Sequence, residues 1–384
     1  MARAANSSLP DGCEHETLLI RRGARSGVTS IIAVHSTVLG PALGGCRMWA
    51  YPSLRHAVAD ALRLSQAMTL KAAAAELPLG GGKSVICLPA RAQPPRGHTR
   101  EQILRDFADC LELLGGSYIT AEDVGTSTAD MALLSRWSEH VVGQPTEQGG
   151  AGDPGAFTAV GVQAAMHACL EHVFGSRSLR GRRVAIVGAG SVGSALARSL
   201  SDEGAELVLA DIDQHKRALA RELNAQWMEP RRALRAQADV LAPCALGGVI
   251  DAALVPELRC RIICGAANNQ LSCDELAGAL AAREILYAPD FIVNAAGLIN
   301  VSLQLTGYDR AEANSRAAGI EMLLGAILSR AAGSGQTPME VAVQRARERL
   351  RAARAPAADR PVLRRQRPPA VAAIRYATAA ERSA

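Results

Sequence analysis

At 384 residues, the chain is too long for one hydrophobic core, and two domains are expected. Its composition, 48% hydrophobic and 21% charged, is ordinary for a globular protein, and no apolar run approaches the roughly 18 residues that a membrane span needs. The N-terminal segment MARAANSSLPDG lacks the apolar stretch of a signal peptide, so we expect a cytoplasmic protein that does not bind membranes.

The formal charge of +5 does not by itself predict a nucleic-acid-binding protein, because most of it lies at one end. Residues 351–384 carry eight arginines against Asp359 and Glu381, a net charge of +6, which leaves −1 for the rest of the chain. This Ala-, Arg- and Pro-rich composition rarely packs a core, so residues 353–384 are expected to form a disordered basic tail. An arm that binds nucleic acid or another partner is the alternative.

The nine cysteines are an odd number and include no CxxC pair. Cys260 and Cys264 come closest to one, but no histidine or second close cysteine pair stands beside them. The pattern therefore favours buried free thiols in a reducing compartment and no metal site.

The first half of the chain mixes strand and helix signals, with glycine and proline interrupting it in GPALGG (40–45) and a glycine-rich loop expected in PLGGGK. Ser53 is a candidate N-cap for an amphipathic helix. In chain order, the predicted elements are strands over 17–22 and 28–38, a helix from Ser53 to about Lys71, a strand over 84–88, a helix over about 100–114 and a strand in YITAEDVG (118–125).

From about residue 150, short apolar strands alternate with helices, which predicts a parallel sheet covered on both faces. A glycine-rich, hinge-like stretch opens a helix that runs to about Phe174. The strands are expected in RRVAIV, ELVLAD, ADVLAP, RIICGAA and ILYAPD, and the last helices over about 310–332 and 338–354.

A GxGxxG pattern follows the strand RRVAIV and opens a helix, the context that a dinucleotide-binding fold requires. Gly188 permits the tight turn, Gly190 lets the backbone approach a pyrophosphate, and Gly193 allows close helix–strand contact. The helix N-terminus then faces the phosphate charge. The predicted cofactor contacts in this turn are Gly188, Ala189, Gly190, Ser191, Val192 and Gly193.

Asp211 ends the next strand, 18 residues after Gly193. A carboxylate there can accept hydrogen bonds from the ribose hydroxyls and would repel a 2′-phosphate, so NAD is expected rather than NADP. The basic residues that follow, at 215–217, are interpreted as solvated helix residues.

Lys71 and Lys83 flank the segment AAAAELPLGGG. Lys83 follows three glycines and precedes a buried-looking strand, so its side chain should project from the strand edge into a cleft. Two ammonium groups in one pocket lower each other's proton affinity, as burial also does. One of them could then act as a base near neutral pH while the other binds a carboxylate.

Several segments resemble the glutamate/leucine/phenylalanine/valine dehydrogenase family, in consistent order over about residues 14–350. They are GPALGGCRMW (40–49), MTLKAAAAELPLGGGKSVI (68–86), YITAEDVGT (118–126), GDPGAFTAVGV (152–162), APCALGGVI (242–250), GAANNQL (265–271) and LYAPDFIVNAAGLINV (286–301). The two-lysine motif together with TAEDVG is the most specific part of the likeness.

The resemblance implies a two-domain α/β fold that closes around its substrate. The N-terminal substrate, catalytic and oligomerisation domain would span 1–148, contain a mixed sheet and be completed by C-terminal helices at about 326–352. The NAD-binding domain, a doubly wound Rossmann-type fold, would span 149–325. The family also implies a homo-oligomer, between a dimer and an octamer.

Residue roles follow from the same likeness. Lys71 matches the lysine that binds the substrate α-carboxylate, and Lys83 the catalytic lysine that helps water attack the imino acid. Asp123 matches the carboxylate that exchanges a proton with the amino group, while Asn268, or Asn269 if the match is shifted by one, resembles the asparagine near substrate and nicotinamide. Further contacts are implied to substrate at Gly44 and Gly45, and to cofactor at Thr158, Cys244, Ala245 and Asn268.

The substrate side chain is expected to be apolar. Leu43 stands where glutamate-specific relatives resemble GPxKGG, so a glutamate carboxylate would lack a charged partner. Leu298 and Val301, with Ala121 nearby, resemble the far end of the side-chain pocket, and bulky leucines leave less room for a ring. We expect oxidative deamination of Val, Leu or Ile, with phenylalanine or another aromatic amino acid as the alternative.

Three further points stay open. NAAG at 294–297 departs from an expected NAGG, and Ala296 should add a methyl group near the substrate pocket. A catalytically inactive partner protein is disfavoured because Lys71, Lys83 and Asp123 are all present. A 2-hydroxy-acid dehydrogenase would need a His/carboxylate pair, and none of the histidines lies in such a motif.

Overall fold

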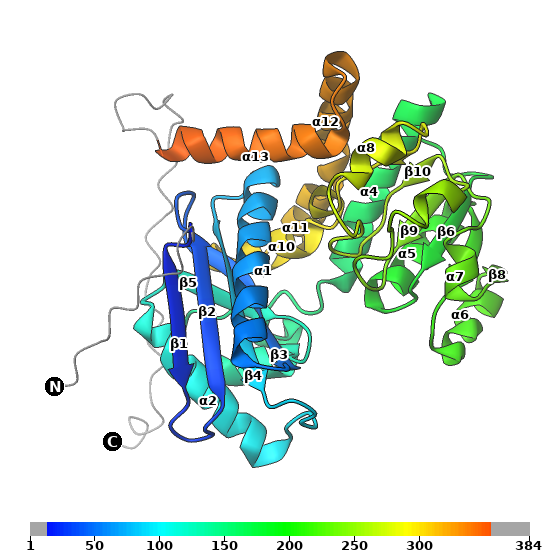
Figure 1. Ribbon diagram of the computed structural model, residues 1–384. Helices are drawn as coiled ribbons and strands as arrows, with labels where there is room; N and C mark the ends of the chain where they lie inside the picture. Colours follow the sequence, from blue (N-terminus) through cyan, green and yellow to red (C-terminus); the bar gives the residue numbers. More distant parts are fainter. Residues whose placement is uncertain (1–13, 355–384) are drawn as a thin grey trace, which may run out of the picture. The chain divides into compact units, whose positions relative to one another are not determined.

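The computed structural model describes residues 14–354, which include two separate β-sheets (Figure 1). The first sheet has five strands in the order β1-β2-β4-β3-β5. β2 pairs antiparallel with β1 and β4, whereas β3 pairs parallel with β4 and β5, so the sheet is mixed as predicted. Along the chain the strands are β1 (Thr17–Arg22), β2 (Thr29–Ser36), β3 (Ala42–Ala50), β4 (Gly80–Leu88) and β5 (Tyr118–Glu122).

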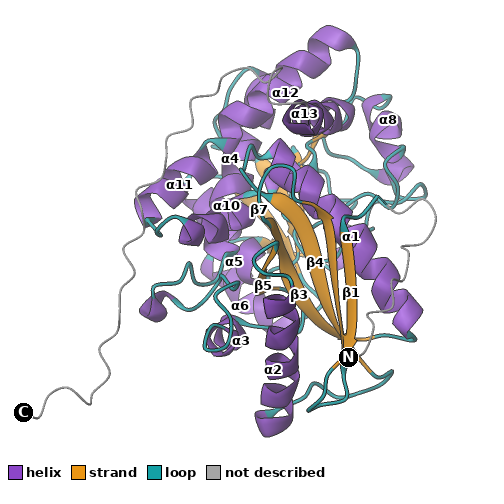
Figure 2. Ribbon diagram, turned by 90° about the vertical axis from the view of Figure 1, so that its left-hand side faces the viewer, coloured by secondary structure: helices purple, strands orange, loops and turns teal. Residues whose placement is uncertain are grey.

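Helices cover both faces of this sheet (Figure 2). On one face lies α1 (Leu54–Ala74), whose Ala57 and Ala61 pack with the strand residue Val85. On the other face α2 (Gly97–Leu113) and α3 (Thr128–Leu134) pack through larger side chains, which are Ile103, Leu104, Phe107, Leu111, Met131 and Leu134. Small side chains on the inner face of α1 therefore bring this helix close to the sheet.

Two segments that were expected to be loops are strand. GPALGG supplies the start of β3, and the glycines of PLGGGK supply the start of β4. A Cβ atom on Gly44 would lie 1.8 Å from the Gly82 carbonyl oxygen, and one on Gly81 would lie 2.0 Å from the Thr69 backbone nitrogen of α1. These glycines therefore serve close backbone packing inside the sheet rather than turns.

The second sheet has six strands, all parallel, in the order β11-β10-β9-β6-β7-β8, which is the Rossmann arrangement. The strands are β6 (Arg183–Val187), β7 (Glu206–Ala210), β8 (Gln226–Trp227), β9 (Val240–Pro243), β10 (Ile262–Ile263) and β11 (Leu286–Tyr287). Alternate strand residues belong to two different hydrophobic clusters, so both faces are buried. The helices between them are α5 (Ser191–Asp202), α6 (Arg217–Glu222), α7 (Pro230–Ala233) and α8 (Leu276–Ala281).

Helices from other parts of the chain join these layers. They are α4 (Gly155–Phe174), α9 (Asp290–Val293), α10 (Ala296–Ser302), α11 (Arg310–Ala318), α12 (Ile320–Ser334) and α13 (Pro338–Arg354). The single helix predicted over 310–332 was wrong, because the chain breaks between α11 and α12 at Gly319. α13 lies against the end of α1, where Arg349 donates hydrogen bonds to the carbonyl oxygens of Ala73 at 3.0 Å and Glu76 at 2.9 Å.

Other sequence expectations have mixed outcomes. Most of the basic tail, from residue 355 onward, lies outside the described residues. All eight cysteines within 14–354 are free; five are buried as expected, but Cys87 and Cys244 are half-buried and Cys273 is exposed. Among these residues no helix is long and apolar enough to cross a membrane, and no group of three or more His, Cys, Asp or Glu could hold a metal ion.

Candidate functional site

The predicted catalytic residues lie on one face of the first sheet. Side chains alternate between the faces of a strand, so Leu43, Gly45, Lys83 and Ala121 share the face opposite to the cluster that packs on α2. The register pairs Gly45 with Ala121, and the pairs Leu43–Gly81 and Cys46–Ser84 place Gly45 beside Lys83. Asp123 follows the end of β5 on the same face. This parity brings together residues that are far apart in the sequence.

Lys83 and Asp123 form an ion pair in which Lys83 Nζ lies 3.0 Å from Asp123 Oδ2. Lys83 is only 5% exposed. The sequence predicted that it would project from the edge of a strand, but it projects from within β4. Burial lowers the pKa of Lys83, although Asp123 opposes the shift. Burial alone would raise the pKa of Asp123, but Lys83 and Arg47 outweigh it and hold that pKa below its ordinary value. The pair is thus an ionised carboxylate beside an amine that gives up its proton more readily than a free lysine.

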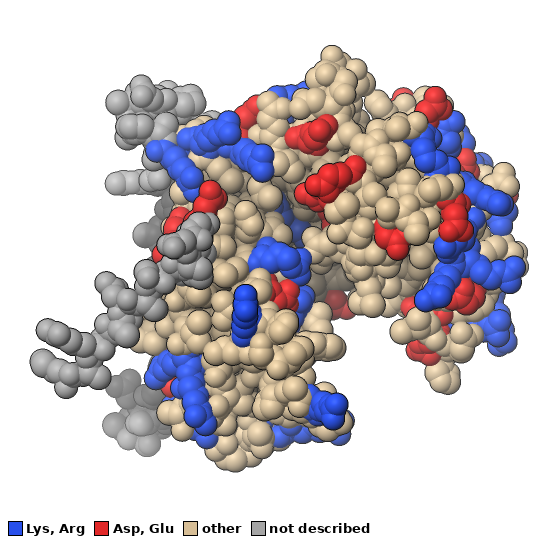
Figure 3. All heavy atoms as spheres, in the orientation of Figure 1, with Lys and Arg blue, Asp and Glu red and all other residues tan. Residues whose placement is uncertain are grey.

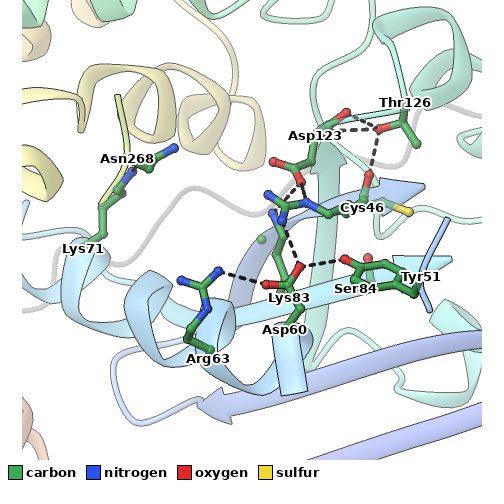
Figure 4. A network of polar contacts seen from close by, with 12 residues as sticks. Cys46, Tyr51, Asp60, Arg63, Lys71, Lys83, Ser84, Asp123, Thr126 and Asn268 are labelled. Atoms are coloured by element: carbon green, nitrogen blue, oxygen red, sulfur yellow. Dashed lines mark hydrogen bonds and ion pairs between the residues drawn. The ribbon is translucent and has the colours of Figure 1, made fainter. Parts of the chain in front are cut away.

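The sequence did not single out a second cation at this carboxylate. Arg47 Nε on β3 donates to Asp123 Oδ2 at 2.8 Å, and its Nη1 donates to Asp60 of α1 at 2.9 Å. Asp60 also accepts hydrogen bonds from Tyr51 at 2.6 Å and from Arg63 at 2.9 Å (Figure 4). The sequence analysis predicted no strand here, so strand parity could not be applied. Once β3 is known to be a strand, an arginine two residues after Gly45 must share the face that carries Lys83.

Lys71 ends up apart from that ion pair, near the C-terminal end of α1. Its Nζ donates to Asn268 Oδ1 at 3.0 Å (Figure 4). Asn294 Nδ2 donates to the same oxygen at 2.9 Å. Burial lowers the pKa of Lys71 to about 8, with a contribution from Lys83 that the sequence had led us to expect. The structure thus brings Asn268 to Lys71, whereas the backbone of Asn269 donates to Asp290 of α9.

The residues predicted to line the side-chain pocket are all apolar and buried. Leu43, Ala121, Leu298 and Val301 are between 1% and 9% exposed and belong to one cluster of hydrophobic residues. Leu298 and Val301 lie one turn apart on α10.

The unexpected Ala296 packs against α4. A Cβ atom on Gly161 of α4 would lie 2.7 Å from Ala296 Cβ, and Ala296 is 1% exposed. The extra methyl group therefore fills the space that Gly161 leaves open. This contact gives NAAG a packing explanation.

The GxGxxG turn has the geometry that a pyrophosphate site needs. Gly188 has a φ of +110°, and a Cβ there would meet the Ala245 nitrogen at 2.7 Å. A Cβ on Gly193 would lie 1.9 Å from the Gly188 oxygen, which explains the close helix–strand contact. Nothing lies within 4 Å of the Cβ position of Gly190, so the backbone there is open to a ligand at the start of α5.

Polar residues surround this turn. Asp211 Oδ2 accepts a hydrogen bond from the Ala189 N–H at 2.6 Å, which places the carboxylate across the turn. Ser191 donates to Asp153 at 2.7 Å, a contact that the sequence did not suggest. Thr158 is buried on α4 and donates to the Pro154 carbonyl oxygen at 2.9 Å.

The backbone of Cys244 follows β9 and donates to the Val187 oxygen at 2.8 Å, beside the turn. Val192 in α5 packs at the edge of the large hydrophobic cluster. Close approach of neighbouring protein atoms therefore requires glycine at 188 and 193, and the open backbone at Gly190 fits a bound dinucleotide.

Comparison with known proteins agrees with this arrangement. Residues 17–140 match the Glu/Leu/Phe/Val dehydrogenase dimerisation domain, and residues 209–317 match the Glutamate/Leucine/Phenylalanine/Valine dehydrogenase family. Residues 162–246 also match the NAD binding domain of D-isomer specific 2-hydroxyacid dehydrogenases, which extends over the Rossmann turn and not over the lysine site.

Individual relatives share most of their length with this chain. Leucine dehydrogenase from Geobacillus stearothermophilus is 43% identical over 78% of this chain and 81% of its own. Valine dehydrogenase from Streptomyces virginiae is 41% identical over 88% and 95%, respectively. The crystal structure of L-tryptophan dehydrogenase from Nostoc punctiforme, 35% identical, superposes with a TM-score of 0.76 over 89% of this chain and 98% of that one. The chain therefore belongs to the Glu/Leu/Phe/Val dehydrogenase family of amino acid dehydrogenases.

Proposed function

We propose that the protein oxidises a branched-chain L-amino acid, Val, Leu or Ile, to its 2-oxo acid and ammonia with NAD, and catalyses the reverse reductive amination. The observation that carries this proposal is the buried, uncharged side chain of Leu43 on the face that holds Lys83 and Asp123. Leu43 itself offers no charge to a substrate carboxylate, whereas an aliphatic substrate side chain gains from burial against it. Leucine and valine dehydrogenases, at 43% and 41% identity, are relatives whose names agree with an aliphatic substrate.

The proposed chemistry divides among four polar residues. Lys71 holds the α-carboxylate of the amino acid, and Asn268, already bonded to Lys71, orients it. Asp123 takes a proton from the substrate ammonium group, which leaves a neutral amine. The bound dinucleotide supplies the hydride acceptor. Lys83 then assists the attack of water on the iminium carbon, and loss of ammonia gives the 2-oxo acid.

The side-chain pocket can be tested with a panel of 2-oxo acids. NADH oxidation in excess ammonia is measured with 2-oxoisovalerate, 2-oxoisocaproate, phenylpyruvate and 2-oxoglutarate. The first two should be preferred, and Leu298→Gly should shift preference toward phenylpyruvate because it enlarges the pocket. The matched control is Leu305→Gly, which removes an exposed leucine nearby and should leave the ratios unchanged. An unaltered profile in Leu298→Gly would contradict the pocket assignment.

An aromatic substrate is the second candidate. The similarity to L-tryptophan dehydrogenase from Nostoc punctiforme favours it, because that chain is 35% identical over nearly its whole length. Phenylpyruvate and indolepyruvate as the best substrates of the unmodified enzyme would establish this reading. The roles of Lys71, Lys83 and Asp123 would then remain, and only the pocket would be reassigned. If none of these 2-oxo acids supports NADH oxidation, the proposed activity is contradicted.

NAD is the proposed dinucleotide because the Asp211 carboxylate lies across the glycine turn, where a 2′-phosphate would bring further negative charge. NADH should therefore give a much higher kcat/KM than NADPH, and Asp211→Ser should narrow the difference. We further propose a homo-oligomer, from dimer to octamer, that works in the cytoplasm. Light scattering measures the oligomeric state. The free thiols of the described residues agree with a reducing compartment such as the cytoplasm.

A further inference from the structure

The two oxygen atoms of the Asp123 carboxylate have unequal surroundings. Lys83 Nζ at 3.0 Å and Arg47 Nε at 2.8 Å both bind Oδ2. Among residues 14–354, no group donates a hydrogen bond to Oδ1. An oxygen that already accepts two charged donors is a poor proton acceptor, whereas its unoccupied neighbour keeps its lone pairs available.

We propose that Oδ1 of Asp123 is the atom that exchanges the proton with the substrate amino group, and that Arg47, anchored by Asp60, is the positioning residue that fixes this choice. The inference rests on the proposed function, in which Asp123 is the proton acceptor. The proton leaves the substrate ammonium nitrogen and binds Oδ1, which makes Asp123 a neutral carboxylic acid. In the reverse direction the same proton returns to nitrogen.

Arg47 can hold the carboxylate in one orientation because its guanidinium is itself held from two sides. Nε points to Asp123 and Nη1 to Asp60, 2.9 Å away, so rotation of the planar group would break both contacts. Asp60 keeps its charge because Tyr51 and Arg63 bind it, and they outweigh burial to lower its pKa. Both contacts of Arg47 join partly buried side chains, which water screens less than exposed ones.

We do not assign the proton exchange with the substrate amino group to the other titratable groups near Asp123. Burial raises the pKa of the Cys46 thiol to about 12 and raises that of Tyr118 as well, so both stay neutral. From α1, Lys71 adds positive charge at longer range and is itself balanced by Asp290 of α9. Glu122 adjoins Asp123, and burial with nearby Asp153 raises its pKa to about 7. Because Glu122 titrates in the working range, the pH experiments need a Glu122→Gln background.

Three variants separate charge from orientation. Arg47→Met removes the cation and the anchor, so kcat should fall about 10- to 100-fold with little change in KM. The pKa that defines the acid limb of the pH profile of kcat should rise by about one unit, because the carboxylate loses a neighbouring positive charge. Arg47→Lys keeps the charge without the two-sided fork, so kcat should fall while the acid limb stays near that of the unmodified enzyme. Asp60→Asn releases the anchor and removes a negative charge, so kcat should fall without any rise of the acid limb.

The matched control is Arg25→Met, because Arg25 also binds two aspartates, Asp106 at 2.9 Å and Asp109 at 2.7 Å, both on α2. Its kcat should stay within about twofold of the unmodified enzyme. Circular dichroism and NADH binding verify that every variant is folded. Unchanged kcat in the Arg47 variants, or an acid limb that rises equally in Arg47→Met and Asp60→Asn, would overturn the inference while the dehydrogenase activity stands. An unmodified enzyme that is silent with all the 2-oxo acids would overturn the proposed function instead.

Discussion

Gly45 gives the most direct test of how the first sheet positions its acidic residue. A Cβ atom at this position would lie 2.8 Å from Asp123 Cβ and 2.7 Å from the Glu122 carbonyl oxygen. Non-bonded carbon atoms prefer separations of about 3.5–4.0 Å. Gly45→Ala must therefore push the start of the β5–α3 connection away from β3 by up to about 1 Å. The carbonyl oxygen belongs to the paired strand and cannot move alone.

The displacement sets the expected size of the effect. Overpacking of this kind costs about 1–3 kcal/mol of unfolding free energy. A misplacement of about 1 Å in a catalytic group can lower the rate about 100-fold. Because Asp123 carries the displacement while Lys71 lies elsewhere on α1, kcat should fall much more than KM rises.

The assay compares kcat and KM for reductive amination with urea unfolding of the same preparations. Gly333→Ala is the matched control, because its Cβ position in α12 has no atom within 4 Å. That variant should gain up to about 1 kcal/mol and keep full activity. If Gly45→Ala unfolds like the unmodified protein and retains activity within twofold, the close contact between β3 and Asp123 is wrong.

Three further predictions concern other contacts. Arg349→Met should lose about 1–3 kcal/mol in urea unfolding, because carbonyl groups at the end of α1 lose a charged donor, whereas the exposed ion-pair variant Arg330→Met should lose less than about 1 kcal/mol. Lys71 loses its proton as the pH rises through about 8, so calorimetric affinity for a non-reacting carboxylate such as isocaproate should fall above that pH; a decline that persists in Lys71→Arg would contradict this. Ala296→Gly should cost about 1–2 kcal/mol by opening space against Gly161 without changing substrate ratios; a changed ratio would return Ala296 to the pocket.

Local patterns predicted five of the six strands of the second sheet and missed only the two-residue edge strand β8. The turn at 188–193 depends on a strand, three glycines and a helix that are adjacent in sequence, and the structure contains all of them in that order. The first sheet was harder, because glycine-rich stretches normally indicate loops. β3 and the start of β4 tolerate glycine because backbone from a neighbouring strand or from α1 fills the space, as at Gly44 and Gly81. Such contacts depend on tertiary packing and leave no local signal.

The polar network around Asp123 could also be predicted only in part from the sequence. The two-lysine motif was recognisable, but its members have different environments. Lys83 is buried in a strand and pairs with Asp123, whereas Lys71 donates to an asparagine 197 residues away in the sequence. Arg47 lay within a motif and was still missed, because GPALGG was expected to be a loop and no strand was predicted around Arg47. Its importance follows only when the β3–β5 register and α1 bring Asp123 and Asp60 to its two ends. A strand's alternation gives the face of each residue from sequence alone, so the combination of parity with a known neighbouring acid could identify such cations in advance.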